Sequence, residues 1–304
     1  MDNWTDTEYL APIFPPVSFT PAAERNLLSL PTNADMEKLK DIRVQNISSI
    51  ANLYRVSKNP IPKTIIQLKN IIEVMLHERE FDDFFGSKEI AAPVIENLKN
   101  EKFLVFPDIK KYARVIGHAE TYEETHELAL RLLKRLEDFE AEKIHKGIRV
   151  CIHLNTILRL IRSKHELVDG ELNEENTARL NELFSFHNNL LFNIFSPEKQ
   201  SVYKGIAFIR KGIFFKDDTN HCNQVEEGFK IIEDTGEIEI YNQLFEEAKR
   251  FGLYSEDTTI PNHIAELDRK TQTKEIMDYC HNLTDAELRR VNTLIRDLVK
   301  PALS

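Results

Sequence analysis

Glycine is scarce in this chain, and this scarcity limits the possible folds more than any other feature. Only 9 of the 304 residues are glycine, whereas a typical protein contains roughly 7%. Glycine adopts the positive φ of tight turns most readily, so few glycines disfavour a sheet with many hairpins. Long helices joined by short loops need fewer such turns. We therefore expect a mainly α-helical, multi-helix globular bundle.

Hydrophobic residues recur at helical spacing along most of the chain. The clearest segment begins at the sequence Thr121-Tyr-Glu-Glu124, which has the pattern of a helix-starting capping box. No glycine or proline interrupts the residues from 118 to 146, and this predicts one continuous helix. Four apolar side chains at steps of three and four mark its buried face: Leu128, Leu132, Leu136 and Phe139.

One segment departs from the helical pattern, and we expect it to form a short β-hairpin near residues 229–241. β-Branched residues lie on both sides of Asp234-Thr-Gly236, a typical turn sequence. After this turn, Ile238 and Ile240 alternate with glutamates, as expected for a half-buried strand.

The predicted organisation has three parts. Residues 1–20 form an arm rich in proline and aromatic residues, 21–170 a helical domain or subdomain, and 171–304 a helical subdomain that contains the hairpin. The boundary at Asp169-Gly170 is weakly marked, so a single domain remains the alternative. The arm either packs on its own domain or docks on a partner. Its candidate partner-binding residues are Trp4, Tyr9, Phe14 and Phe19.

The overall charge restricts the expected partners. The chain has 40 basic and 50 acidic side chains, a formal net charge of −10. Nucleic acid is therefore an unexpected partner unless a local basic patch exists. No run of about 18 apolar residues is present, so we expect no membrane partner. The N-terminus lacks the pattern of a signal peptide, and three cysteines fit a reducing compartment. We expect a soluble, cytoplasmic protein, with homo-oligomerisation left open.

The cysteines are the weak candidates for a metal site. Each has a histidine within two positions, and three thiolates with one imidazole would suit tetrahedral zinc. Neighbouring residues on a helix, however, point about 100° apart, so only one member of each pair could bind the metal. Buried cysteine without a metal is the commoner case. We therefore expect neither metal nor cofactor, and the candidates remain Cys151, Cys222 and Cys280.

Two Glu-x-x-His pairs are spaced as in di-iron helical bundles, namely Glu123/His126 and Glu142/His145. On one continuous helix they would lie about 28 Å apart, at 1.5 Å per residue. A single metal site could not use both pairs, so we expect them to lie on a solvated helix surface.

The segment from Arg159 to His165, RLIRSKH, resembles the Arg-x4–6-His motif of HEPN-type ribonucleases. These are small helical bundles that are often dimeric. The resemblance implies that His165 acts as general acid or base and that Arg159 stabilises developing phosphorane charge, without a metal. It covers seven residues, and Leu160 replaces the polar residue that the family favours.

Common nucleotide-binding and hydrolase signatures are absent, including Gly-x-Gly-x-x-Gly, the P-loop, Gly-x-Ser-x-Gly and His-Glu-x-x-His. The leading expectation is an intracellular helical protein-interaction or regulatory protein without catalytic activity, whose partner is another protein. The alternative is a metal-independent ribonuclease that uses Arg159 and His165.

Overall fold

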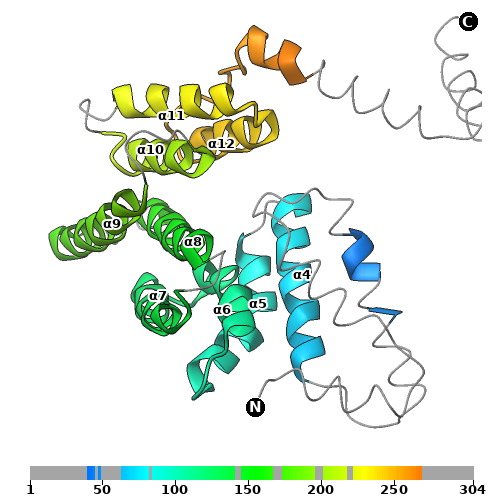
Figure 1. Ribbon diagram of the computed structural model, residues 1–304. Helices are drawn as coiled ribbons and strands as arrows, with labels where there is room; N and C mark the ends of the chain where they lie inside the picture. Colours follow the sequence, from blue (N-terminus) through cyan, green and yellow to red (C-terminus); the bar gives the residue numbers. More distant parts are fainter. Residues whose placement is uncertain are drawn as a thin grey trace, which may run out of the picture.

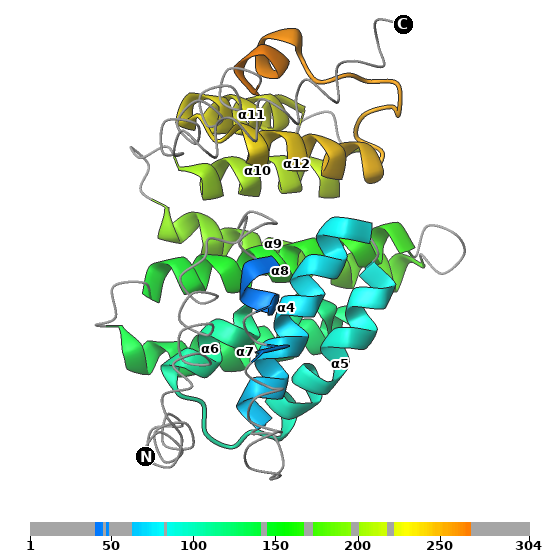
Figure 2. The ribbon, with the colours of Figure 1, turned by 90° about the vertical axis from the view of Figure 1, so that its right-hand side faces the viewer.

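The computed structural model describes residues 40–44, 47–48, 63–81, 84–140, 145–166, 173–195, 201–217 and 222–268. Within these ranges all regular secondary structure is helical and no strand is present, which confirms the mainly α-helical fold. Over the same ranges, no helix combines the length and apolar character needed to cross a lipid bilayer. Figures 1 and 2 show α10, α11 and α12 stacked on one side of a larger group of helices.

Residues 40–44, 47–48 and 262–268 are helical, and between residues 48 and 262 the described helices follow one another along the chain. In order they are α4 (Lys63–Phe81), α5 (Phe84–Asn100), α6 (Phe106–Ala113), η1 (Ile116–His118), α7 (Tyr122–Leu136), η2 (Glu137–Phe139), α8 (His145–Glu166), α9 (Glu174–Ile194), α10 (Val202–Phe214), α11 (Cys222–Thr235) and α12 (Ile238–Arg250).

Polar side chains cap several helices at their N-termini, where backbone N–H groups have no intrahelical partner. The Thr121 hydroxyl accepts a hydrogen bond from the Glu124 N–H at 3.1 Å and begins α7 as predicted. Asn173 caps α9 through the Asn176 N–H at 2.7 Å, and Ser201 caps α10. These caps explain why the breaks between helices fall where they do.

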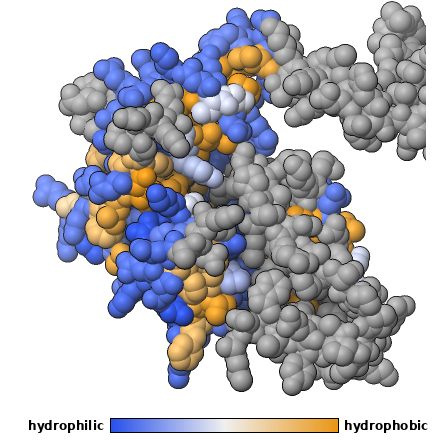
Figure 3. All heavy atoms as spheres, viewed as in Figure 1, coloured by the Kyte–Doolittle hydropathy of each residue, from blue (hydrophilic) through white to orange (hydrophobic). Residues whose placement is uncertain are grey.

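Two hydrophobic cores meet on helix α8. The first joins α4, α5, α6, η1 and α7 with residues of α8 such as Ile148 and Ile152. The second core contains residues of α9, α10, α11 and α12 together with other residues of α8, including Leu154 and Ile157. Helix α8 therefore connects the two groups of helices seen in Figure 1. On the face shown in Figure 3, apolar atoms gather around α9 and α10 between more hydrophilic regions.

The predicted hairpin is wrong, because residues 229–235 belong to helix α11 and residues 238–241 to helix α12. Phe229 and Ile232 are three residues apart and both are buried, which is helical spacing rather than the alternation of a strand. Gly236 has a φ of 75° and lies directly after α11. A glycine in this left-handed conformation ends a helix just as readily as it forms a hairpin turn.

The single helix predicted across residues 118–146 is also wrong. Helix α7 ends at Leu136, the short η2 follows, and α8 begins at His145. Leu128, Leu132 and Leu136 are buried as predicted, so the periodicity was informative although the length was not. His126 and His145 therefore lie on different helices. Residues 141–144, which include Glu142, lie outside the described ranges.

Candidate functional site

A cavity of about 390 Å³ lies among helices α8, α10 and α12, with α4 on its other side. We call it the α8–α10–α12 cavity. Its apolar wall has a regular origin, since each of the three helices contributes two apolar residues four positions apart. Residues four apart lie on one helix face. The six residues are Leu154 and Leu158 of α8, Val202 and Ile206 of α10, and Ile240 and Leu244 of α12.

An ion pair holds the three cavity-lining helices together. The Arg210 guanidinium on α10 donates to both carboxylate oxygens of Glu247 on α12, at 2.8 and 2.9 Å. It also donates to the Leu154 carbonyl on α8 at 3.1 Å. The two side chains are only 11% and 14% exposed. Because bidentate geometry fixes both partners, this pair sets the relative positions of the helices around the cavity.

The second carboxylate of the cavity is Glu78 on α4. Its Oε1 atom lies 3.1 Å from His118 Nε2 and 2.9 Å from Arg162 Nη2. Burial alone would raise the pKa of the Glu78 carboxyl, but His118 and Arg162 together hold that pKa well below its usual range. Glu78 is therefore ionised at neutral pH and acts as an anchor for these two side chains.

Cys151 and Arg114 line the same cavity. Burial raises the pKa of the Cys151 thiol and lowers the pKa of the Arg114 guanidinium. The Cys151 thiol donates to the Ala113 carbonyl at 3.8 Å, and the Asn155 amide donates to the same oxygen at 2.7 Å. A thiol with a raised pKa carries little thiolate at neutral pH, so Cys151 is a poor nucleophile in this setting.

The two residues of the ribonuclease motif point to different surroundings. Arg159 is buried, forms an ion pair with Glu166 at 3.2 Å, and donates to the Glu120 carbonyl. His165 is exposed and packs edge-on against Phe251, with ring centroids 5.5 Å apart. A spacing of six residues separates two directions on an α-helix by about 120°. The geometry within α8 therefore does not bring Arg159 and His165 together.

The cysteine candidates for metal binding can be followed only in part. Cys151 lies in the cavity wall, whereas the neighbouring His153 turns toward His187. Cys222 is the first residue of α11 and its side chain is not described, and Cys280 lies outside the described residues. Where side chains are described, no group of three histidine, cysteine or acidic residues could hold a metal ion. We assign no metal ligand.

The predicted arm, including Trp4, Tyr9, Phe14 and Phe19, lies outside the described residues, as does the predicted boundary at Asp169-Gly170. The cavity itself was not anticipated from the sequence. Its signal was present in the apolar pairs four residues apart within α8, α10 and α12. Such pairs also occur in ordinary core helices, so the sequence could not distinguish a cavity wall from a filled core.

Comparison with known proteins gives no relative: no protein-family model, no curated protein and no solved structure matches this chain.

Proposed function

We propose that this chain is a binding or regulatory protein that holds an apolar segment of another protein in the α8–α10–α12 cavity. The observation that carries the proposal is the apolar wall built from three pairs of residues four apart. A partner helix whose apolar residues follow the same spacing can insert one or two large side chains between such pairs. The cavity volume of about 390 Å³ is at the lower end of the range for ligand pockets, about 300–1,000 Å³.

The charged groups of the cavity favour binding over chemistry. Glu247 is held by Arg210, and Glu78 is held by His118 and Arg162. A general base needs a pKa near the working pH and access to substrate. The ion pairs occupy both carboxylates, and the pKa of Glu78 is held well below its usual range. Glu237, by contrast, is exposed beside the cavity. We therefore expect the partner segment to carry a lysine or arginine next to its apolar anchor.

The ribonuclease alternative gains no support from the positions of Arg159 and His165, because each contacts different neighbours.

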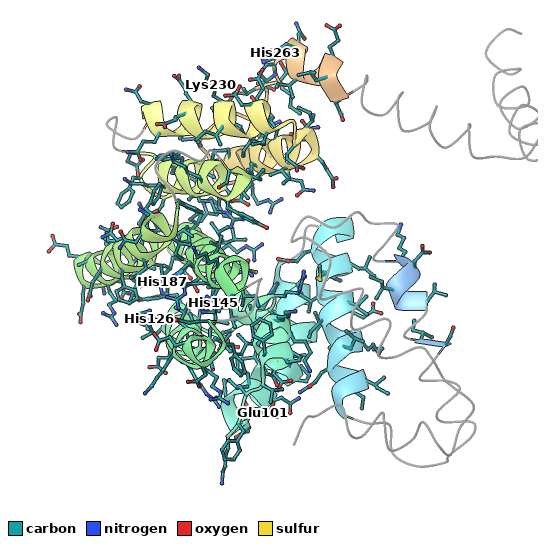
Figure 4. All side chains as sticks on the ribbon, viewed as in Figure 1. Glu101, His126, His145, His187, Lys230 and His263 are labelled. Carbon is teal, nitrogen blue, oxygen red and sulfur yellow. The ribbon has the colours of Figure 1, made fainter. Side chains whose placement is uncertain are left out.

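A photo-cross-linking experiment in the native cell tests the proposal. A photoreactive phenylalanine analogue replaces Gln243, which is exposed beside the cavity. The matched control places the same group at Lys230, which projects from the outer side of α11 in Figure 4. We expect a discrete protein adduct from position 243 that is absent from position 230. A small-molecule adduct at position 243 would indicate that the cavity binds a metabolite and not a protein segment. Equal labelling from both positions would contradict the proposal.

A further inference from the structure

Three histidines from three helices form a hydrogen-bonded chain on the side of α8 that faces α7 and α9. His187 of α9 is in the middle. Its Nε2 atom lies 2.9 Å from His126 Nδ1 of α7, and its Nδ1 atom lies 3.0 Å from His153 Nδ1 of α8. Figure 4 shows His126 and His187 close to one another at α7 and α9.

The arrangement is a linear chain rather than a metal site. His187 contacts its two neighbours through different ring nitrogens. The three imidazoles therefore do not direct their nitrogens to one point, as a bound metal ion would require. This agrees with the finding that no group of three such side chains, among those described, could hold a metal ion.

Burial favours the uncharged form of this chain, and the hydrogen bonds exclude protonation of two adjacent rings together. His187 is fully buried, His153 is 2% exposed, and His126 is half-buried. A neutral imidazole has one donor and one acceptor nitrogen, so three neutral rings can make both contacts with one proton in each. When two adjacent rings are both protonated, two N–H groups face each other and their contact becomes repulsive.

Burial is also the main cause of the lowered pKa values of the two inner histidines. Burial lowers the pKa of His187 to about 3, with further lowering by His153 and His126. Burial, with a smaller effect of Arg149 on α8, lowers the pKa of His153 to about 4.

The pKa of His126 is also lowered, first by burial and then by Arg179 of α9, while Glu127 of α7 and Glu182 of α9 oppose the shift. The outer end of the chain is thus the end nearest to carboxylates, and it is the end at which a proton from solvent would enter.

We propose that His126, His187 and His153 form a histidine latch that fastens α7, α8 and α9 together at neutral pH and releases their packing on acidification. When the helices separate, each histidine regains contact with water and binds a proton more readily. Protons therefore shift the equilibrium toward the open state. With an ordinary pKa of 6.5 in the open state, His187 and His153 each favour opening by about tenfold at pH 5.5.

The position of the latch gives this opening a consequence for α8. His153 lies next to Leu154, which lines the α8–α10–α12 cavity. Release of the latch therefore loosens one side of the helix whose other side lines the cavity. The latch itself does not depend on which partner the cavity holds, so the two proposals can fail separately.

Hydrogen exchange of the full chain between pH 7.5 and 5.5 tests the latch, after correction for the intrinsic pH dependence of exchange. We expect the opening constant of amides in α7 and α9 to rise by at least about tenfold, the effect of one histidine. The pair α10 and α11 serves as the internal reference. His187→Gln keeps a donor and an acceptor without titrating, and should reduce the rise by about tenfold. The control His263→Gln changes an exposed histidine and should leave the rise intact.

Imidazole ¹⁵N NMR of the unmodified chain supplies a second readout that remains valid if His187→Gln fails to fold. We expect scalar coupling across the two N–H···N hydrogen bonds at pH 7.5, and neutral His153 and His187 rings in the folded protein at pH 5.5. Titration of His153 and His187 near pH 6.5 in the folded state would overturn the latch. Equal changes of exchange in α7, α9, α10 and α11 would also overturn it.

Discussion

The backbones of α10 and α11 are in direct contact at Gly205 and Gly228. A Cβ atom added to Gly228 would lie 2.8 Å from the Gly205 carbonyl oxygen, and one added to Gly205 would lie 2.8 Å from the Gly228 carbonyl oxygen. Real Cβ atoms do not approach so closely, so this packing requires glycine on both helices. The contact positions α10, which also provides Val202 and Ile206 to the cavity.

Gly228→Ala is therefore expected to destabilise the fold. The new methyl group must displace backbone atoms, and overpacking of this kind costs about 1–3 kcal/mol. Gly147→Ala is the matched control, because Gly147 lies within α8 and a Cβ there meets nothing within 4 Å. It should stabilise the protein by about 0.5–1 kcal/mol. Urea unfolding measures both, and equal effects of the two substitutions would contradict the close helix contact.

The Arg210–Glu247 pair gives a second prediction. Arg210→Met leaves the carboxylate of Glu247 poorly solvated without its partner, and we expect a loss of about 3–5 kcal/mol in unfolding free energy. In the double variant Arg210→Met/Glu247→Leu, neither charge of the pair remains and most of the loss should be recovered. Additive losses in the double variant would show that the ion pair is not the source of the effect.

The parts of the fold that depend on interactions between residues close in the sequence were predictable. The cap at Thr121 and the buried leucines of α7 were evident in the sequence because capping and periodicity act within a few residues. The error at residues 229–241 arose because Asp234-Thr-Gly236 suits both a hairpin turn and a helix end. Burial of Phe229 and Ile232 on one helix face decides between these two structures, and burial depends on tertiary packing.

The cavity and the histidine latch were less predictable, because both depend on packing between segments that are distant in the sequence. His126 is 61 residues from His187, and His187 is 34 residues from His153. Their meeting requires a specific register of α7, α8 and α9, which no local pattern specifies. Hydrophobic periodicity indicated which faces are buried, but it could not indicate where the helices leave a cavity.

The pH dependence of stability should reveal the buried histidines. The pKa of His187 is lowered to about 3 and that of His153 to about 4 from the ordinary histidine value of 6.5. The unfolded chain thus binds more protons below pH 6.5. The contribution of His187 and His153 to stability is complete above pH 6.5, and it is lost as the pH falls toward their folded-state pKa values.

Relative to wild type, the unfolding free energy of His187→Gln should improve by about 1.4 kcal/mol between pH 7.5 and 5.5. Urea unfolding at the two pH values measures this difference. A difference that does not change with pH would mean that His187 titrates alike in the folded and unfolded chain.

The thiol of Cys151 should react slowly in the folded protein. Burial raises its pKa, so the thiolate fraction at pH 8 is small and the sulfur lies within the cavity wall. Alkylation with iodoacetamide, followed by mass spectrometry of the peptide, should be at least about tenfold slower than in denaturant. Alkylation of Cys151 at the denatured rate would contradict the placement of this side chain.

Binding to the cavity is tested most directly with the partner segment that cross-links at position 243. This segment is made as a peptide, and its affinity is measured for the wild-type chain and for two variants. Leu158→Trp fills the cavity from α8, and Leu190→Trp adds the same side chain at a partly exposed position of α9. Calorimetric titration should show binding weakened by at least about tenfold, or about 1.4 kcal/mol, for Leu158→Trp. Leu190→Trp should bind like the wild type. Equal affinity of all three forms, with unchanged melting temperatures, would show that the segment binds elsewhere and would contradict the proposed function.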